Sequence, residues 1–273
     1  MVIGGPCVLE TPELSMEIGE ALRKACAEAG FAYVFKASYD KANRSSAASA
    51  RGPGMEAGLD QLASLRERLG VPVLTDVHGA EQCARVAQSV DVLQIPAFLC
   101  RQTDLLVAAG EACADGASVA SCVNIKKGQF LSPGEMGGPV DKVRGAGCAQ
   151  VMVTERGTFF GYGRLVNDFV GMGELLDGVG GGERRPPVCY DATHSVQRPG
   201  ARDADGRLYS GGARERVPML CCAAVAAGVD ALFIECHPDP ERAPSDGANM
   251  LRLADAPGLI RRLARVREAA LGA

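Results

Sequence analysis

The sequence lacks the features that mark several broad classes of protein. No apolar run approaches the roughly 20 residues that a membrane span needs, and no basic segment followed by an apolar core marks a signal peptide after Met1. No two cysteines have the Cys-x-x-Cys spacing of a zinc ribbon. The formal net charge is −4, so no basic excess favours nucleic acid or an anionic membrane. We therefore expect neither of these as a partner.

Cysteine is the one reactive residue type that is abundant. The chain has 11 cysteines, an odd number, and many of them stand in apolar helical contexts. A secreted disulfide framework is disfavoured by this pattern, whereas buried free thiols are typical of a reducing compartment. We therefore expect a cytoplasmic protein.

Length and patterning favour a single α/β domain over residues 1–273. Eight short apolar runs alternate with stretches of helical periodicity, and the runs show little period-two alternation, as expected for strands of a parallel sheet buried on both faces. This order predicts one (β/α)8 TIM barrel. The predicted strands are residues 2–5, 32–35, 71–74, 90–93, 119–125, 151–154, 187–190 and 231–234. The predicted helices are residues 14–29, 54–69, 81–88, 102–112, 139–146, 166–176, 216–227 and 256–270.

Each predicted strand is followed closely by a residue that can bind charge, a metal or a sugar. In such barrels the chemistry gathers at the carboxyl ends of the strands. The residues at these ends are Cys7, Lys36, Asp76, Gln94, Lys126, Arg156, His194 and Glu235. We therefore expect a site at this face of the barrel.

Cations from separate strands indicate an anionic substrate. Lys36, Lys126 and Arg156 follow three different strands, and buried cations repel one another unless an anion joins them. Residues 36–46 add further cations, an amide and hydroxyls, which suit a phosphate or carboxylate. A solvated surface loop is the alternative for this segment.

A second set suits a divalent metal. Cys7, His194, Glu235 and Asp246 would meet near the seam of the barrel. A thiolate, an imidazole and two carboxylates can bind Zn²⁺, Fe²⁺ or Mn²⁺. Taken singly, each residue also fits a packed thiol, a satisfied polar group or a turn, so the set depends on the barrel.

Other residues have more open interpretations. Gln94 could bind a polyol, Asp76 could accept from sugar hydroxyls or cap a helix, and Arg101 could reach the site of a partner subunit. Residues 198–212 are expected to form a long loop above the barrel mouth, with a lid as its function.

Several segments resemble the 3-deoxy-D-manno-octulosonate 8-phosphate synthases across essentially the whole chain. The most specific are Lys-Ala-Asn-Arg-Ser-Ser at 41–46 and Gln-Ile-Pro-Ala-Phe at 94–98. The others are Gly-Gly-Pro-Cys-Val-Leu-Glu at 4–10, Leu-Thr-Asp-Val-His at 74–78, Asn-Ile-Lys-Lys-Gly at 124–128, Thr-Glu-Arg-Gly at 154–157, Asp-Ala-Thr-His-Ser-Val-Gln at 191–197 and Phe-Ile-Glu-Cys-His-Pro at 233–238.

The resemblance implies a transferase that condenses phosphoenolpyruvate with D-arabinose 5-phosphate and water. The products would be 3-deoxy-D-manno-octulosonate 8-phosphate, a lipopolysaccharide precursor, and phosphate. It also implies a cytoplasmic homotetramer. The residues implied to bind phosphoenolpyruvate are Lys36, Lys126, Arg156 and His194, and those implied to bind the sugar phosphate are Lys41, Asn43, Arg44, Ser45, Gln94 and Arg101.

The resemblance also bears on the metal and on catalysis. Metal-dependent members carry cysteine at the position of Cys7 where metal-independent members carry asparagine, so Cys7, His194, Glu235 and Asp246 are implied to be the ligands. Together with this family pattern, the residues suggest Lys36, Asp76, His194 and Asp246 as catalytic. Two alternatives remain: a 3-deoxy-D-arabino-heptulosonate 7-phosphate synthase using erythrose 4-phosphate, and a non-catalytic anion-binding or thiol-based sensor barrel.

Overall fold

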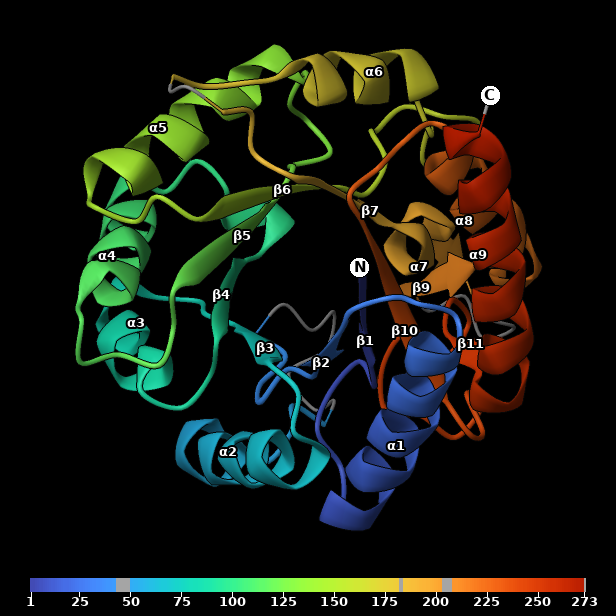
Figure 1. Cartoon of the computed structure of the whole chain (residues 1–273), viewed down its shortest axis with the longest axis horizontal. Helices are drawn as coiled ribbons and strands as arrows, with labels where there is room; N and C mark the ends of the chain where they lie inside the picture. The colour runs from blue at the N-terminus through green and yellow to red at the C-terminus, as the bar shows by residue number, and fades with distance from the viewer. Residues whose placement is uncertain (43–49, 182–183, 203–207, 273) are drawn as a thin grey trace.

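A closed barrel of eight parallel strands forms the centre of the structure. The computed structural model describes residues 1–42, 50–181, 184–202 and 208–272. The strands pair in chain order from the first to the seventh, and the last one pairs with the seventh and with the first. They are β1 (Val2–Gly5), β2 (Tyr33–Lys36), β3 (Val73–Asp76), β4 (Val92–Ile95), β5 (Cys122–Lys126), β6 (Val151–Glu155), β7 (Val188–Asp191) and β10 (Ala231–His237). The predicted (β/α)8 barrel is therefore confirmed (Figure 1).

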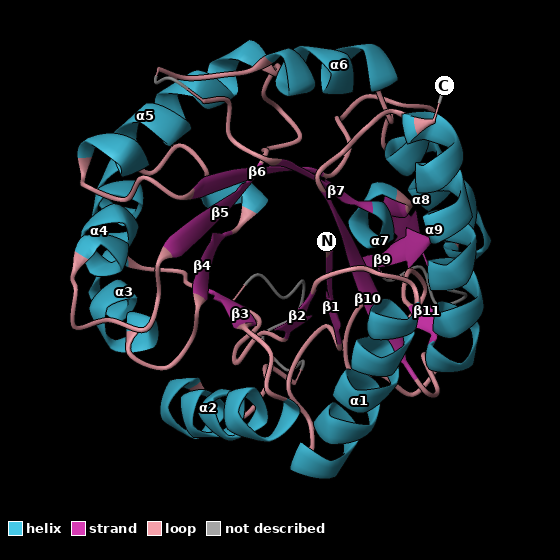
Figure 2. Cartoon of the chain, in the orientation of Figure 1, coloured by secondary structure: helices cyan, strands magenta, loops and turns pink. Residues whose placement is uncertain are grey.

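Helices surround the barrel on its outside, as Figure 2 shows. The surrounding helices are α1 (Pro12–Glu28), α2 (Met55–Leu69), α3 (Ala80–Ala87), α4 (Thr103–Ala114), α5 (Gly137–Gly145), α6 (Phe169–Asp177), α8 (Val217–Ala226) and α9 (Ala256–Leu271). Local sequence signals place several of their ends. Thr11 caps α1 by accepting a hydrogen bond from the Leu14 amide, and Pro12 occupies its first turn. Gly70 ends α2 with φ of 62°, a conformation that glycine adopts without steric cost.

Apolar side chains form two separate layers. The larger layer lies between strands and helices, where Leu22, Leu62 and Val86 are fully or almost fully buried. A smaller cluster fills the barrel interior and includes Ile3, Leu74 and Phe233. The interior beyond this cluster is lined by polar side chains at the carboxyl ends of the strands, and this arrangement positions the candidate site.

The observed strands extend further toward their carboxyl ends than hydropathy predicted. Lys36, Asp76 and Asp191 lie inside β2, β3 and β7 rather than after them, and all three are buried. The apolar runs stop before these polar residues, so hydropathy places these strand ends too early. The ladder continues because these polar side chains find partners inside the barrel, so polarity does not end the strand.

The described residues of the predicted loop, 198–202 and 208–212, lie in strands. There β8 (Gln197–Arg202) pairs antiparallel with β9 (Leu208–Gly212). The short helix α7 (Ala192–Ser195) and the two-residue strand β11 (Leu251–Arg252), which pairs with β10, are further elements that hydropathy did not predict.

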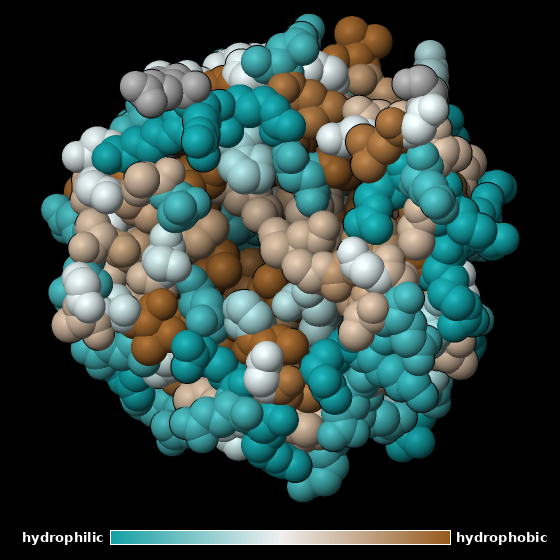
Figure 3. All heavy atoms as spheres, in the orientation of Figure 1, coloured by the Kyte–Doolittle hydropathy of each residue, from teal (hydrophilic) through white to brown (hydrophobic). Residues whose placement is uncertain are grey.

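None of the helices in the described part of the chain combines the length and the apolar character that crossing a membrane requires. On the face shown in Figure 3, hydrophilic residues gather toward the outer rim and hydrophobic ones are more frequent toward the middle.

The first prediction concerns Gly5, which ends β1 beside Lys36. A Cβ at Gly5 would lie 2.0 Å from the carbonyl oxygen of Lys36, closer than any real contact, so β1 and β2 would have to separate. We expect Gly5→Ala to lower the free energy of unfolding by about 1–3 kcal/mol. Urea unfolding measures this change. Gly116→Ala, where nothing lies within 4 Å of the added carbon, is the control; equal effects of the two substitutions would contradict the prediction.

Candidate functional site

Polar side chains from seven different strands converge at one end of the barrel. The strand ladders align the ends of neighbouring strands. Asp76 pairs with Gln94 in the β3–β4 ladder, and Gly5, the last residue of β1, pairs with Glu235 in the β1–β10 ladder. The strand residues are Lys36, Asp76, Gln94, Lys126, Glu155, Asp191 and Glu235, and all are buried. Lys36, Asp76, Gln94, Lys126 and Glu235 are among the predicted strand-end residues, and the structure places them at one end of the barrel.

Two lysines of this end are held by buried carboxylates. Lys36 Nζ lies 2.6 Å from Glu235 Oε1, and its second acceptor is the carbonyl oxygen of Cys7 at 2.8 Å. Lys126 Nζ lies 2.5 Å from Asp191 Oδ2. Phe233 lies beneath both, with its ring centroid 3.7 Å from Lys126 Nζ and 5.4 Å from Lys36 Nζ. Ion pairing and the aromatic face together offset the cost of burying the two ammonium groups.

Arg156 has a buried guanidinium nitrogen that makes no hydrogen bond to the described residues. Its Nη2 donates to Gln197 Oε1 at 2.6 Å, whereas Nη1 is buried and has no hydrogen-bond partner among the described residues. The turn beneath it is fixed, since Glu155 Oε1 accepts from the amides of Arg156 and Gly157. A buried donor without a partner is costly. An anion in the barrel mouth would satisfy it.

The electrostatics of this anion site come from burial. Burial lowers the pKa of Lys126, with Asp191 opposing the shift, and it also lowers the pKa of Arg156. For Asp191, burial alone would raise the pKa, but His194 and Lys126 hold it well below its usual range. Asp191 is therefore the ionised group that keeps Lys126 charged.

Lys127, the neighbour of Lys126, points to a different set of partners. Lys127 Nζ donates to the carbonyl oxygen of Leu131 at 3.0 Å and to Thr158 Oγ1 at 3.3 Å. It also lies 3.3 Å from Glu155 Oε2. It thus ties the segment after β5 to the segment after β6, outside the anion site.

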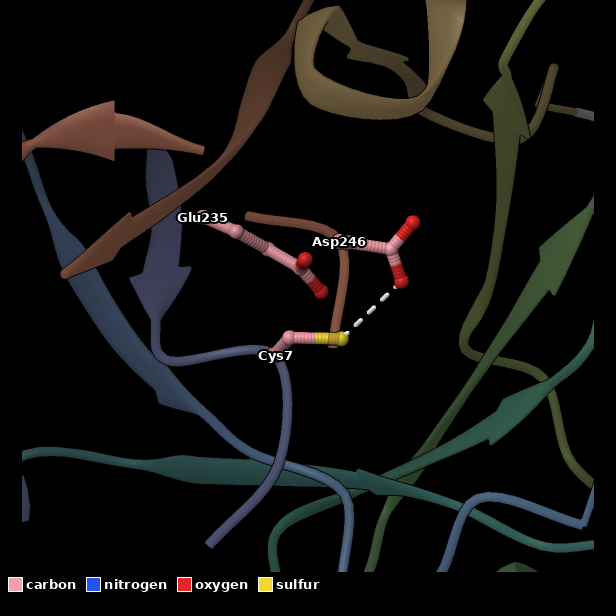
Figure 4. Close-up of side chains that lie close together, drawn as sticks. All are labelled: Cys7, Glu235 and Asp246. Atoms are coloured by element: carbon pink, nitrogen blue, oxygen red, sulfur yellow. Dashed lines mark hydrogen bonds between the residues drawn. The ribbon is translucent and has the colours of Figure 1, made fainter. Parts of the chain in front are cut away.

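A second group of side chains forms a candidate metal centre (Figure 4). Ligand atoms of Cys7, Glu235 and Asp246 all lie within 4.8 Å of one another. They come from the segment after β1, from β10 and from the segment after it, and their side chains point toward one another. Cys7 Sγ donates a hydrogen bond to Asp246 Oδ2 at 3.3 Å. Three of the four predicted ligands are therefore close together.

His194, the fourth predicted ligand, borders the same space. Its Nδ1 lies 2.7 Å from Asp191 Oδ2 and its Nε2 lies 3.6 Å from Glu235 Oε2, which is buried without a hydrogen-bond partner among the described residues. We assign the proton to Nδ1 because ionised Asp191 can only accept. Nε2 and Oε2 then face each other as two acceptors. A cation between them would satisfy both, so the donor set fits a divalent metal.

Protonation states agree with this fit. Burial and the nearby Glu235 raise the pKa of the Cys7 thiol well above its usual range. For Asp246, burial would raise the pKa, but His194, Lys41 and the hydrogen bonds from Cys7 and Gln197 hold it far below. The site thus pairs a protonated thiol with an ionised carboxylate, and a bound cation is what would stabilise the thiolate.

The residues expected to bind a sugar phosphate are placed in part. Lys41 Nζ donates to Ser38 Oγ at 2.9 Å, and nearby acidic groups raise its pKa despite burial. Asp76 Oδ2 lies 2.8 Å from His78 Nε2, while its Oδ1 is buried and has no partner within the described ranges. Arg101 is exposed, away from the buried strand ends. Asn43, Arg44 and Ser45 lie outside the described residues.

The helix-capping interpretation of Asp76 finds no support, since α3 begins after Gly79 and has no side-chain cap. Gln94 Oε1 accepts from Asn124 Nδ2 at 3.1 Å, so its own amide nitrogen is the group left to meet a ligand hydroxyl. Asn124 Oδ1 in turn accepts from Thr154 at 2.7 Å, so the three residues form a polar row across β4, β5 and β6.

Sequence reasoning missed several residues that organise the site. Asp191 holds Lys126 and His194, Thr193 Oγ1 accepts from the Glu235 amide at 2.8 Å, and Gln197 bridges Arg156 and Asp246. All three stand within a segment quoted for the family resemblance. Asp191 follows a predicted strand directly, so its position was a usable signal, whereas the bridging role of Gln197 depends on tertiary geometry.

Comparisons with known proteins agree with this geometry. A model of the DAHP synthetase I family matches residues 1–269. The chain is 52% identical over 262 residues to 2-dehydro-3-deoxyphosphooctonate aldolase of Rhodopseudomonas palustris strain TIE-1, covering 96% of this chain and 86% of that protein. It is 53% identical to the protein of the same name from Methylobacterium radiotolerans, over 96% of this chain and 87% of that one. The corresponding protein of Bradyrhizobium diazoefficiens is 52% identical over the same shares.

The second prediction concerns Asp191. We expect Asp191→Asn to lower the free energy of unfolding at pH 7 by about 3–5 kcal/mol, because Lys126 loses its buried partner. Since the pKa of Asp191 is lowered in the folded protein, its contribution is complete above the unfolded value of about 3.9 and is lost as the pH falls below it.

The difference between wild type and variant should therefore shrink in acid, as urea unfolding at stepwise lower pH would measure. Asp60→Asn, at an exposed position on α2, serves as the control and should change stability by less than about 0.5 kcal/mol. A gap between wild type and Asp191→Asn that is independent of pH would show that the ion pair does not stabilise the fold.

Proposed function

The chain belongs to the DAHP synthetase I family, and on this premise we propose that it is a 3-deoxy-8-phosphooctulonate synthase. Its relatives bear the name 2-dehydro-3-deoxyphosphooctonate aldolase, which denotes the same enzyme. The reaction condenses phosphoenolpyruvate with D-arabinose 5-phosphate and water, giving 3-deoxy-D-manno-octulosonate 8-phosphate and inorganic phosphate. The product serves lipopolysaccharide precursor synthesis.

One observation supports this function above the others: the unused buried donor of Arg156 beside Lys126 and Lys36. The two lysines already have carboxylate partners, so a further anion is needed chiefly by Arg156. Phosphoenolpyruvate carries a phosphate ester and a carboxylate on the same carbon atom, C2. A guanidinium and two ammonium groups on one buried floor can hold both groups at once.

The reaction needs positioning more than strong acids or bases. C3 of phosphoenolpyruvate forms a bond to the aldehyde carbon of the sugar, water adds at C2, and the C2–O bond to phosphate then breaks. Lys36, Lys126 and Arg156 fix phosphoenolpyruvate. Lys41, Asp76 and Gln94 orient the sugar phosphate, so the two reactants are held in position for the bond to form. Asp76 Oδ1, which has no partner among the described residues, can accept a hydrogen bond from a hydroxyl group of the sugar.

We propose that Cys7, His194, Glu235 and Asp246 hold a divalent transition metal such as Zn²⁺, Fe²⁺ or Mn²⁺. When bound, such an ion supplies Lewis acidity, which serves either to polarise the aldehyde or to acidify the attacking water. Asp191 keeps the His194 proton on Nδ1 and leaves Nε2 as a ligand. Lys36 Nζ donates a hydrogen bond to Glu235 Oε1, so the other carboxylate oxygen, Oε2, is left to face the candidate metal centre.

Arg101 and the residues around it support an oligomeric enzyme. Four phenylalanines, here called the aromatic rim, lie in a row with neighbouring ring centroids 6.1–6.5 Å apart, in the order Phe130, Phe98, Phe159 and Phe160. Phe98 is 54% exposed and Phe160 is 99% exposed. A second copy that covers the aromatic rim would bring the neighbouring Arg101 toward another site. We therefore propose a homotetramer in the cytoplasm, with Arg101 binding the sugar phosphate held by a neighbouring copy and Asn43, Arg44 and Ser45 completing that subsite.

The alternative functions have less support. Erythrose 4-phosphate as the aldose would fit the family name, but the relatives at 52–53% identity bear the octonate name. A sensor barrel without activity would not need both a candidate metal centre and a separate anion site. Comparison of the two aldoses in one assay decides between the enzymes.

The third prediction concerns this activity. Purified protein with phosphoenolpyruvate should release inorganic phosphate when D-arabinose 5-phosphate is added, and far less with erythrose 4-phosphate. Lys126→Met should lower kcat/KM at least about 100-fold, because a preorganised charge is lost. Lys24→Met, which removes an exposed lysine of α1, should leave the rate unchanged. Absence of phosphate release with either aldose would refute the proposed function.

The fourth prediction concerns the metal. Exhaustive chelation should abolish phosphate release, and Zn²⁺, Fe²⁺ or Mn²⁺ should restore it. Cys7→Ala should bind each ion at least about 10-fold more weakly than wild type, since a thiolate ligand is lost. Elemental analysis and calorimetric titration give the measurements. Full activity of protein in which no metal is detectable would eliminate the metal from the proposal while leaving the reaction intact.

The fifth prediction concerns subunits. Arg101→Ala and Lys126→Met should each be nearly inactive alone. If Arg101 serves a neighbouring site, mixing the two variants under conditions of subunit exchange creates some sites that have both residues intact, and activity returns in part. No recovery in mixtures whose exchange is verified by native mass spectrometry would assign Arg101 to its own subunit.

A further inference from the structure

Gln197 connects the two halves of the site. Its Oε1 accepts from Arg156 Nη2 at 2.6 Å, and its Nε2 donates to Asp246 Oδ1 at 2.9 Å. Arg156 belongs to the anion site, whereas Asp246 belongs to the candidate metal centre. The half-buried amide of Gln197 thus touches both without belonging to either.

The chemistry of the partners fixes the direction of this amide. A guanidinium can only donate hydrogen bonds and an ionised carboxylate can only accept them. The primary amide of Gln197 has an acceptor oxygen for Arg156 and a donor nitrogen for Asp246, and both lie within hydrogen-bond distance of their partners. The contact to Arg156 uses Nη2 and leaves Nη1 to face the anion site. The contact to Asp246 uses Oδ1 and leaves Oδ2 beside Cys7.

The backbone of Gln197 is anchored to the segment that carries Asp246. Gln197 begins β8 and pairs with Gly212 of β9. A Cβ at Gly212 would lie 1.7 Å from Asn249 Oδ1 and 2.8 Å from the carbonyl oxygen of Ala248. Only glycine permits this approach, so the base of the hairpin is packed directly on Ala248 and Asn249. The distance from Gln197 to Asp246 is therefore set by packing.

Asp246 itself is held in an unusual conformation. Its φ is 51°, a region that residues other than glycine seldom adopt. Its carboxylate accepts from Cys7, Gln197 and Ser245. Strain of this kind persists where the surroundings determine a side chain more than once. Several hydrogen bonds thus fix the orientation of the Asp246 carboxylate. Gln197 donates the one that connects it to the anion site.

We propose that Gln197 is a positioning residue that holds Arg156 and Asp246 in their binding orientations together, so that metal binding and phosphoenolpyruvate binding reinforce each other. The inference rests on the proposed function, since it takes the two ligands from it. Because the Gln197 amide is bonded to both residues, a ligand that fixes Arg156 or Asp246 in its binding orientation also favours the binding orientation of the other. Reciprocity follows: each ligand raises the affinity for the other by the same factor.

The test measures this coupling factor without turnover. Co²⁺ is titrated into the metal-free protein with and without phosphoenolpyruvate, and binding is followed by the sulfur-to-cobalt charge-transfer absorption of Cys7. The reverse titration measures phosphoenolpyruvate binding by calorimetry with and without Co²⁺. In the wild type we expect a coupling factor within about 5–150. In Gln197→Met, which keeps the length of the side chain and removes both hydrogen bonds, we expect a factor at least about three times smaller.

Two further variants make the comparison specific. Gln197→Asn keeps the amide but shortens the side chain by one methylene, so it cannot reach both partners; it should lose coupling as Gln197→Met does, and it replaces that variant if the latter fails to fold. Gln61→Met is the matched control, because Gln61 donates a 3.1 Å hydrogen bond to Ser15 between two outer helices. Its coupling factor should equal that of the wild type.

A coupling factor in Gln197→Met and Gln197→Asn that equals the wild-type factor would overturn the inference. A wild type in which neither ligand affects the other would overturn it as well. Both outcomes differ from failure of the proposed function, which is read from phosphate release and not from these titrations: a protein that couples Co²⁺ to phosphoenolpyruvate without catalysis refutes the reaction and keeps the role of Gln197.

Discussion

Two buried carboxylates, Glu235 and Asp191, determine where the positive charges of the barrel mouth can stand. Each carboxylate has two partners. Glu235 pairs with Lys36 through one oxygen and faces His194 with the other. Asp191 pairs with both Lys126 and His194. Without them the lysines would lose charge or leave the interior. The anion site and the candidate metal centre are therefore not independent features added to a barrel. They are two uses of one charge network.

This sharing explains why the candidate site tolerates so much burial. Lys36, Lys126 and Arg156 are each at most 6% exposed, and carboxylate partners hold the two lysines in place. The apolar cluster around Phe233 closes the space below. Charges held between an aromatic floor and a ligand act in a medium of low polarisability, where each is worth more than in water.

The sequence predicted the barrel and the positions of its functional residues better than it predicted their partners. Periodicity identifies parallel strands in chain order, and the fold then places Lys36, Lys126 and Glu235 at one end without further information. It could not show that Lys36 pairs with Glu235, residues 199 positions apart, because pairing depends on rotamers inside the barrel. The hairpin of β8 and β9 was missed for a different reason. Its glycines and charged residues suggest a loop, whereas the two strands pair and Gly212 packs against Ala248 and Asn249.

Lys126 and Lys127 show how far two identical neighbours can diverge. Lys126, the last residue of β5, pairs with Asp191 inside the barrel, whereas Lys127, just past the strand, bonds to Leu131 and Thr158. An engineer who wishes to retune ligand preference would alter the first and keep the second, while one who wishes to transplant the connecting segments from a homologue would have to carry the second along with its receptors. Two neighbouring lysines thus have to be treated separately when residues are exchanged between homologues.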